Sequence, residues 1–385
     1  MTVLLTGADG YLGWPTALRL ADRLDERIVG VDNLARRDWV EESGSVSAVP
    51  IDDPETRFEA RPNLSFVEGD LADREFVDQI LAVHQPNTVL HLAAQPSAPY
   101  SGINGERALY TQRNNLSMNL NLLHGLHENG LEDAHFIETT TTGIYGAPEF
   151  PIPEGGLSVE RDGGEDELPF PALGGSWYHA AKSFDNANMR LATTEWDQPI
   201  SEVRTAIVFG TETEETTGTG LPTRFDFDYY FGTVVNRFCA QAVAGYPLTV
   251  YGKGEQRKPM VSLRDAVESL AALVEDGPGG GPDFGGVEVY NQVARPVAIV
   301  ELAETIAEVG EEFGIDADVE HFENPREEDE EHEMEMENDA FRDLVGGVDQ
   351  ELEAGIRDTL ESLIEYEDRI TAREDRFLPG VLTGE

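Results

Sequence analysis

Short apolar runs alternate with longer amphipathic stretches through the first half of the chain. The runs are rich in β-branched residues and predict strands at Val3–Leu5, Ile28–Val31, Thr88–His91, His135–Glu138 and Val203–Phe209. Apolar positions at helical spacing predict helices at Leu12–Leu24, Phe76–His84, Tyr110–Glu128 and Tyr178–Trp196. We therefore predict an α/β fold, built on a Rossmann-type, doubly wound parallel sheet with helices on both faces.

The pattern changes after residue 230. A helical stretch begins at Phe231, a short strand follows at Leu248–Tyr251, and another helix follows at Asp265–Glu275. These elements predict a smaller C-terminal α/β lobe that binds the substrate. We expect the large domain to span residues 1–230 and the lobe residues 231–385, with elements of the two interleaved.

Three segments lack a regular period. Gly155–Gly175 is rich in Gly, Pro and acidic residues and is expected to form a long surface loop. Thr211–Phe227 is polar and rich in Thr and Gly, which predicts a flexible segment over a site. Glu327–Glu337 is almost entirely acidic and is interpreted as solvated surface. His332 and its acidic neighbours could bind a hard cation weakly, but the surface interpretation is preferred, and no structural metal is predicted.

Acidic residues dominate the charge of the chain. There are 75 Asp and Glu residues against 27 Lys and Arg, which gives a formal net charge of -48. A surface this negative repels nucleic acid and anionic membranes, so neither is expected as a partner. The acidic residues are spread along the chain, as in proteins of haloarchaeal type that stay hydrated in molar salt. We expect the protein to lose stability in dilute buffer, because its own charges repel one another there.

Cys239 is the single cysteine, which excludes an intrachain disulfide and a cysteine metal cluster. Its apolar neighbours predict a buried thiol rather than a nucleophile. The first strand begins at Thr2, so we expect no signal peptide. No apolar run reaches the roughly 18 residues that a membrane helix needs. We therefore expect a cytoplasmic protein.

Three glycines directly follow the first predicted strand and open the next helix. Gly7, Gly10 and Gly13 have the spacing GxxGxxG, which is typical of a turn that binds the pyrophosphate of a dinucleotide. A side chain there would hold the pyrophosphate away from the helix N-terminus, whose amides and dipole bind it. Asp32 ends the second strand, where a carboxylate can bind the ribose hydroxyls of NAD and repel the 2′-phosphate of NADP. NAD is therefore the predicted cofactor.

Other cofactor contacts are predicted at strand ends. Asp70 and Leu71 follow a strand-like run and are expected near the adenine. Arg36 and Arg37 are the evidence against a preference for NAD, because they could hold the 2′-phosphate of NADP. The predicted cofactor-binding residues are Gly7, Gly10, Tyr11, Leu12, Gly13, Asp32, Asn33, Arg36, Asp70, Leu71, Leu92, Ala93, Asn114, Tyr178 and Lys182.

Tyr178 and Lys182 stand four residues apart on a predicted helix, so both side chains project from one face. An ammonium beside a phenol stabilises the phenolate and lowers the tyrosine pKa toward working pH, which makes Tyr178 a candidate general base. Lys182 could also hold the nicotinamide ribose. Thr141, after the strand His135–Glu138, could share the substrate proton. Together these residues predict hydride transfer at a sugar hydroxyl, in a redox-neutral cycle that keeps NAD tightly bound.

Longer segments than these motifs also match a known pattern. They are Gly10–Trp14, Val31–Arg37, Gln95–Ser101, Tyr110–Asn115, Trp177–Lys182, Asn236–Cys239, Pro247–Gly254 and Asn324–Arg326. In these segments the chain resembles the extended short-chain dehydrogenase/reductases, the NAD-dependent epimerase/dehydratase family. Within that family it is most similar to the UDP-sulfoquinovose synthases, and the resemblance covers most of the chain.

The resemblance implies an enzyme that converts UDP-glucose and sulfite to UDP-sulfoquinovose through a 4-keto intermediate, with NAD as cofactor. It implies a catalytic trio of Thr141, Tyr178 and Lys182, with His179 at the sugar and sulfite site. Arginines and Lys258 would hold the UDP phosphates, with Arg257 and Lys258 as alternatives at one position. The substrate-binding residues that it implies are Gln95, Tyr100, Thr141, Asn236, Arg237, Arg257, Lys258 and Arg326. The implied partners are the UDP-sugar, sulfite or a sulfite donor, and a second copy of the chain that docks through the Tyr110 and Tyr178 helices.

Three positions depart from the pattern of the synthases. The family carries a glutamate where Ile144 stands, and a glutamate and an arginine where Ala94 and Pro96 stand. Such groups would serve the loss of water from the sugar and the capture of sulfite. The segment Thr141–Gly146 is closer to that of a UDP-glucose 4-epimerase, which only oxidises, rotates and re-reduces its sugar. A 4-epimerase or related epimerase/dehydratase is therefore the second candidate. A non-catalytic NAD sensor is the third, although such sensors usually lack the tyrosine–lysine pair.

Overall fold

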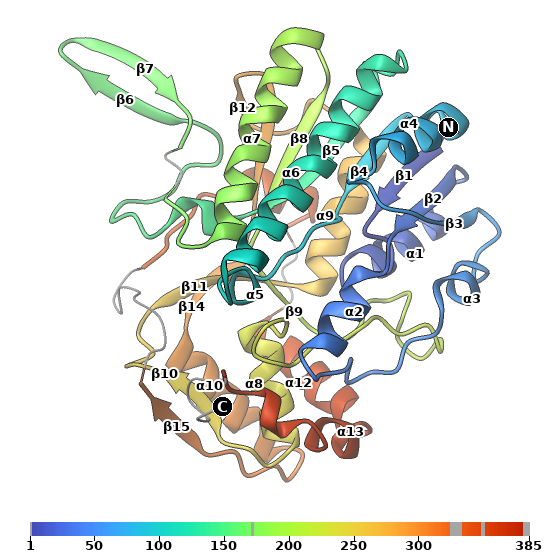
Figure 1. Cartoon of the computed structure of the whole chain (residues 1–385). Helices are drawn as coiled ribbons and strands as arrows, with labels where there is room; N and C mark the ends of the chain where they lie inside the picture. Colours follow the sequence, from blue (N-terminus) through green and yellow to red (C-terminus); the bar gives the residue numbers. More distant parts are fainter. Residues whose placement is uncertain (1, 171–172, 324–332, 348–350, 380–385) are drawn as a thin grey trace.

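A sheet of eight strands, in the order β12-β13-β8-β5-β4-β1-β2-β3, forms the centre of the molecule (Figure 1). The structure is a computed structural model that describes residues 2–170, 173–323, 333–347 and 351–379. The eight strands are β1 (Thr2–Thr6), β2 (Arg27–Asp32), β3 (Leu64–Glu68), β4 (Thr88–His91), β5 (His135–Thr141), β8 (Ile200–Thr205), β12 (Asp283–Phe284) and β13 (Val287–Gln292). Neighbouring strands pair in parallel except β12 and β13. The strand order reverses at β1 and β4, and ligands bind α/β sheets at the carboxyl ends of strands beside such a reversal.

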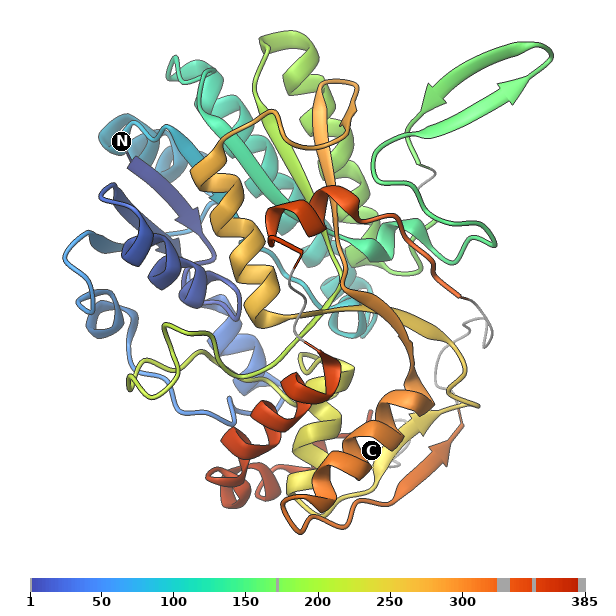
Figure 2. The ribbon, with the colours of Figure 1, turned by 180° about the vertical axis from the view of Figure 1, so that it is seen from behind.

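Helices cover both faces of this sheet because successive strand residues point to opposite sides. Leu4 of β1 packs into the cluster on one face, and Leu5 packs into the cluster on the other. The first face carries α4 (Arg74–His84), α6 (Gly105–Glu128) and α7 (Trp177–Trp196), and the second carries α1 (Gly13–Arg23) and α9 (Leu263–Asp276) (Figures 1 and 2). This arrangement confirms the predicted α/β fold with a doubly wound sheet.

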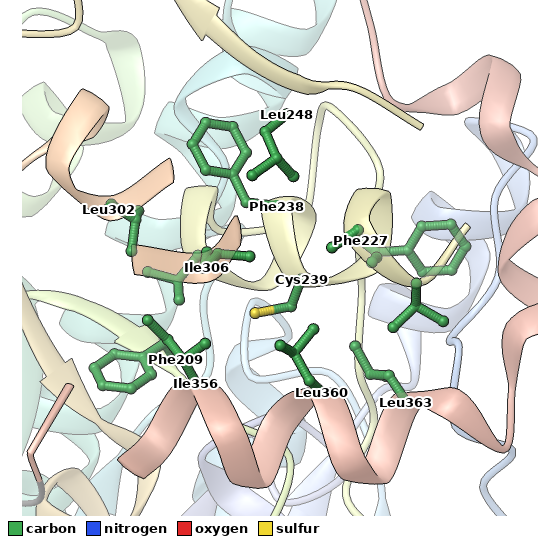
Figure 3. Packing of buried hydrophobic residues seen from close by; sticks show 14 of the residues in the cluster. Phe209, Phe227, Phe238, Cys239, Leu248, Leu302, Ile306, Ile356, Leu360 and Leu363 are labelled. Carbon is green, nitrogen blue, oxygen red and sulfur yellow. The ribbon is translucent and has the colours of Figure 1, made fainter. Parts of the chain in front are cut away.

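A separate hydrophobic cluster forms the core of the smaller lobe. Its elements are α8 (Val234–Val243), α10 (Ile299–Glu311), α12 (Leu352–Ile364), α13 (Glu367–Thr371), the paired strands β10 (Leu248–Tyr251) and β15 (Val319–Phe322), and the sheet of β14 (Arg295–Ala298), β11 (Arg257–Ser262) and β9 (Ile207–Phe209). Cys239 is fully buried in this core, where it lies among Phe227, Ile306 and Leu360 (Figure 3). Burial raises the pKa of its thiol, and the predicted buried thiol is confirmed.

The two parts of the chain exchange strands. The prediction of one strand over Val203–Phe209 is wrong: β8 ends at Thr205 in the large sheet, and β9 pairs with β11 of the smaller lobe. Conversely, β13 comes from the second half of the chain and pairs with β8 in the large sheet. The apolar run continues across Ala206, so its pattern could not reveal a change of partner strand.

The predicted loop Gly155–Gly175 contains a hairpin that projects from the body of the molecule (Figure 1). Its strands are β6 (Leu157–Arg161) and β7 (Gly164–Leu168). Asp162 and Gly163, both with positive φ angles of 52° and 81°, form the two-residue turn between them. An Asp-Gly pair is a strong hairpin signal, and the abundance of acidic residues in both strands obscured it.

The segment Thr211–Phe227 packs against both the large domain and the smaller lobe and does not form a free loop over a site. Phe225 and Phe227 are fully buried, because they belong to the core of the smaller lobe. The Trp14 indole donates to the Leu221 carbonyl at 3.1 Å, and the Thr223 hydroxyl donates to the Tyr11 carbonyl at 3.1 Å. Its polar composition led the prediction to miss these anchors.

Of the predicted acidic surface segment Glu327–Glu337, residues 327–332, including His332, lie outside the described residues. The rest is not solvated surface throughout, because Met334 is buried beside Ile152 and Met336 forms a β-bridge with Ile152. The remaining short helices are α2 (Ala35–Glu42), α3 (Pro54–Phe58), α5 (Ala98–Ser101) and α11 (Asp339–Leu344), with 3-10 turns at Thr142–Tyr145 and Glu374–Arg376. Among the described helices, none has the length and apolar character to cross a membrane.

Candidate active site

The glycine turn between β1 and α1 leaves no room for side chains. Gly7 has a φ of +73°, and a Cβ there would lie 2.7 Å from the Ala93 nitrogen. A Cβ on Gly10 would lie 2.9 Å from the Gly7 carbonyl oxygen, and a Cβ on Gly13 would lie 2.0 Å from it. The backbone is therefore packed tightly at the N-terminus of α1, which is the geometry that a pyrophosphate group needs.

Asp32 is fixed at the end of β2 by backbone amides. Its carboxylate accepts hydrogen bonds from the amides of Asp9 at 3.0 Å and Leu34 at 2.8 Å. Burial raises the pKa of this carboxyl group, and the two amide hydrogen bonds oppose the change. Asp32 lines the cleft beside the glycine turn, so it is placed to accept hydroxyl groups from a ribose.

Both arginines that could hold a 2′-phosphate have other partners. The Arg37 guanidinium binds both carboxylate oxygens of Asp9, at 2.7 and 2.8 Å. The Arg36 guanidinium donates to Asp226 at 2.9 Å and stacks 4.2 Å from the centre of the Phe231 ring. A 2′-phosphate would have to break one of these ion pairs, so the residues fit NAD better than NADP.

A small side pocket next to the glycine turn suits the adenine. It is lined by Val31, Asp32, Asn33, Trp39, Gly69, Leu71, Ala93, Ala94, Asn114 and Met118. Of the two residues predicted near the adenine, only one lines this pocket. Leu71 lines the pocket, whereas Asp70 is exposed and its carboxylate accepts the Ala72 amide at 2.9 Å. Asp70 therefore shapes the chain before α4 and is not among the lining residues.

The predicted catalytic residues meet at the carboxyl end of β5. Thr141 ends that strand, and its hydroxyl accepts the Gly143 amide at 3.1 Å. The helix α7 begins beside it, and the Ser176 hydroxyl caps it by accepting the His179 amide at 3.1 Å. The residues Thr141, Tyr178, His179 and Lys182 all line the same cleft.

The electrostatics of Tyr178 differ from the expectation. Burial raises its pKa, Lys182 and hydrogen bonding with Thr141 lower it, and the nearby carboxylates of Asp185 and Glu138 raise it further. The balance is a raised pKa, so the predicted lowering by Lys182 is present but outweighed. Burial is the largest cause of the raised pKa, and the two carboxylates add to it, because the ammonium of Lys182 lies 2.9 Å from Glu138 and 3.2 Å from Asp185.

The cleft extends from the glycine turn to the smaller lobe and has a volume of about 1720 Å³. A single small-molecule pocket is usually about 300–1,000 Å³, so this cleft has room for two ligands side by side. From the smaller lobe it receives Asn236, Arg237, Thr249, Tyr251, Gln256 and Lys258. A cofactor on the first domain and a substrate on the lobe would therefore meet at Tyr178.

Asn236 ties the two sides of the cleft together. Its side chain accepts the Gly210 amide at 3.1 Å and donates to the Tyr11 hydroxyl at 3.3 Å, and that hydroxyl donates to the Gly210 carbonyl. Tyr11 and Asn236 were predicted for separate ligands, whereas the structure joins them in one hydrogen-bonded group. This group holds the glycine turn against the smaller lobe.

Three predicted substrate residues do not line the cleft. Gln95 is fully buried and accepts the Thr111 hydroxyl at 3.1 Å, and Tyr100 is buried among Trp39 and Phe231. These two side chains support α6 and α2 instead. Arg257 pairs with Glu301 at 3.6 Å and Glu333 at 3.3 Å, because it points away from its neighbour Lys258 on β11. Arg326 lies outside the described residues.

Of the three positions that depart from the synthase pattern, two line the cleft and one is buried in a hydrophobic cluster. Ala94 and Pro96 line the cleft, so the missing charged groups would have faced a ligand there. Ile144 is instead buried in a cluster with Tyr145, Ile152 and Met334. An isoleucine at position 144 therefore extends the core behind Thr141.

Sequence reasoning missed Glu138 and Asp185, the partners of Lys182. Both side chains are fully buried. The signals were a glutamate at the end of the apolar run His135–Glu138 and an aspartate one helical turn after Lys182. Either could have been read as a counter-ion for a buried lysine.

Comparison with known proteins gives the family of the chain. The sequence profile of the NAD dependent epimerase/dehydratase family matches residues 3–284. The UDP-sulfoquinovose synthase of Sulfolobus acidocaldarius is 36% identical over 98% of this chain and 96% of its own length. The chloroplastic UDP-sulfoquinovose synthase of Spinacia oleracea is 34% identical over 98% of this chain and 78% of its own length.

Solved structures share the fold. The UDP-glucose 4-epimerase of Thermotoga maritima, solved with UDP-glucose, aligns with a TM-score of 0.71 and 22% identity over 95% of this chain and 99% of its own. The UDP-glucuronic acid 4-epimerase of Bacillus cereus, solved with UDP-glucuronic acid and NAD, aligns with a TM-score of 0.68 and 18% identity over 95% of this chain and 99% of its own.

Proposed function

Because this chain belongs to the NAD-dependent epimerase/dehydratase family, we propose that it is a UDP-sulfoquinovose synthase, which makes UDP-sulfoquinovose from UDP-glucose and sulfite. The observation that carries the proposal is its similarity to two such synthases, from an archaeon and a plant, over 98% of the chain. The cleft supports it, because Tyr178 and Thr141 stand between a dinucleotide turn and the cationic side chains of the smaller lobe.

In the oxidation step of this mechanism the chain holds the sugar and moves one proton. Tyr178 takes the proton of the sugar hydroxyl through its phenol oxygen, and the Thr141 hydroxyl shares that proton. The glycine turn and Asp32 would hold NAD, which would supply the acceptor for the hydride of the sugar and the means of its return. Lys182 stabilises the charge on the phenol oxygen and remains close enough to hold a ribose. The removal and return of hydride make the overall reaction redox-neutral.

The smaller lobe supplies the positive charge for a UDP group. Arg237 is mostly buried at the cleft, and Lys258 lines it from β11. In a chain with a net charge of -48, cations at a ligand cleft favour an anionic ligand. His179 lies beside Tyr178, with ring centres 5.4 Å apart, where it would meet the sugar and sulfite.

A UDP-glucose 4-epimerase remains the second candidate, and the wall of the cleft favours it. Ala94 and Pro96 supply no acid or cation to the cleft, and Thr142 and Gly143 follow the catalytic threonine in place of acidic residues. An epimerase needs none of these groups, because its keto-sugar only rotates before the hydride returns.

The assay for the function uses purified protein in molar KCl with UDP-glucose, with and without sulfite. We expect a product that is heavier than UDP-glucose by one sulfite less one water and that forms only when sulfite is present. Mass spectrometry resolves this species. Conversion of UDP-glucose to UDP-galactose at unchanged mass would reject the synthase and establish the epimerase.

The outer faces of α6 and α7 support a homodimer. These two helices lie side by side on one side of the molecule (Figure 1). On α7, Trp177, Phe184 and Leu191 are exposed by 57%, 52% and 58% and recur every seven residues, so they share one face. Leu109 and Leu120 of α6 are also exposed. An apolar patch of this kind is expected to be covered by a second copy of the chain.

Charged residues in that patch should separate the dimer. We expect Phe184→Glu combined with Leu191→Glu to raise the dimer dissociation constant by at least roughly 100-fold, because two apolar anchors would become charged. Analytical ultracentrifugation in molar KCl measures the change. Val83→Glu is the matched control, because Val83 is 73% exposed on α4, away from this patch. A monomeric parent protein, or an unchanged dimer in the double variant, would contradict the proposal.

A further inference from the structure

The ammonium of Lys182 lies between two buried carboxylates. Its Nζ is 2.9 Å from Glu138 Oε1 and 3.2 Å from Asp185 Oδ2, and both acidic side chains are fully buried. An ammonium has three N–H donors; one of them is donated to Glu138, and the same ammonium forms an ion pair with Asp185. Lys182 thus serves the cleft with only part of its hydrogen-bonding capacity.

Both carboxylates are placed by rigid elements. Glu138 belongs to β5, three residues before Thr141, and Asp185 lies on α7, three residues after Lys182. The Asn119 amide on α6 donates to the other oxygen of Glu138 at 2.6 Å. The Asn188 amide on α7 in turn donates to Asn119 at 3.0 Å. The central strand and both helices thus lock the group around Lys182.

The two acids differ in how readily they ionise. Burial raises the pKa of Glu138, but Lys182, His91 and the hydrogen bonds it accepts outweigh burial, and the pKa is lowered. Burial and the repulsion of Glu138 raise the pKa of Asp185 well above its ordinary value, against the attraction of Lys182. His91 faces the group from β4, and burial lowers its pKa to about 4, so it is neutral. The buried group therefore pairs the ammonium of Lys182 with one acid that ionises more readily than usual, Glu138, and one that ionises less readily than usual, Asp185.

We propose that Glu138 is a positioning residue whose carboxylate, fixed against the ammonium of Lys182, sets how readily the phenol of Tyr178 gives up its proton. This inference rests on the proposed role of Tyr178 as the base. A carboxylate close to the phenol disfavours the phenolate and cancels part of the field of Lys182. Removing that negative charge should therefore lower the pKa of Tyr178, whereas adding one would raise it.

The test compares two variants that differ only in Glu138. Asp185→Asn is the reference, because it removes the second acid that could ionise in place of Glu138. We expect Glu138→Gln in that background to lower the titration midpoint of Tyr178 by about one pH unit or more. Tyrosinate absorbance reports the midpoint, as the difference between each variant and the same variant with Tyr178→Phe. An equal or higher midpoint would overturn the proposal.

Two further measurements keep the test decisive. Glu202→Gln is the matched control, because Glu202 is an equally buried carboxylate that binds Arg204 at 2.9 Å. The titration midpoint of Tyr178 should be unchanged in this variant. If the double variant does not fold, Glu138→Gln alone should lower the Tyr178 midpoint, measured in the same way. An equal or higher midpoint in that single variant would overturn the proposal. These titrations need no substrate, so they stand apart from the outcome of the sulfite assay.

Discussion

Tyr178→Phe should reduce product formation from UDP-glucose by roughly 1,000-fold, within the range of about 10²–10⁴ that a general base contributes. The substitution removes only the hydroxyl and keeps the ring beside His179. Lys182 keeps its two carboxylate partners, and the glycine turn is untouched. We therefore expect bound NAD and the melting temperature to stay close to those of the parent protein.

The measurement is the initial rate of product formation by mass spectrometry, with the NAD content determined after denaturation. Tyr290→Phe is the matched control, because it removes a phenol that donates to Glu288 at 3.2 Å on β13, outside the cleft. A full rate for Tyr178→Phe would contradict the assignment of the base. If the parent protein itself binds NAD but shows no activity in any assay, a non-catalytic NAD sensor would be favoured instead.

Gly13→Ala should weaken NAD binding by at least roughly 100-fold, because the new Cβ cannot be accommodated. It would lie 2.0 Å from the Gly7 carbonyl oxygen and 2.8 Å from the Gly7 carbonyl carbon. Both atoms belong to the backbone of the turn, so relief requires the turn itself to move. That movement withdraws the amides at the N-terminus of α1 from the pyrophosphate.

Calorimetric titration of NAD-free protein with NAD measures this loss. Gly105→Ala is the control, because a Cβ on Gly105, the first residue of α6, meets no atom within 4 Å. It should bind NAD as the parent protein does. Unchanged affinity in Gly13→Ala would show that the turn does not hold the pyrophosphate.

The features that were predicted correctly depend on residues close together in the chain. The strand and helix periods indicated the doubly wound sheet, since each period records which face of an element is buried. The spacing of Gly7, Gly10 and Gly13 indicated the turn, because a Cβ on Gly10 or Gly13 would clash with Gly7 of the same turn. The spacing of Tyr178 and Lys182 placed both on one helical face that lines the cleft.

Other features needed contacts between distant segments. Arg36 is paired with Asp226, and Arg37 with Asp9, whereas the sequence shows only two adjacent arginines after a strand. Arg257 and Lys258 are neighbours with similar charge, and the pairing of β11 decides that only Lys258 lines the cleft. No local sequence pattern could distinguish the cationic side chains that line the cleft from those held in ion pairs.

The sequence alone therefore indicates the sheet, the glycine turn and the tyrosine–lysine pair, because local sterics and periodicity carry that information, and the family follows from the resemblance of longer segments. The tertiary structure decides which charged side chains form internal ion pairs and which line the cleft. Glu138 reaches Lys182 from 44 positions away, across the contact between β5 and α7. Electrostatic energy depends on distance and burial, and both are set only when the chain has folded.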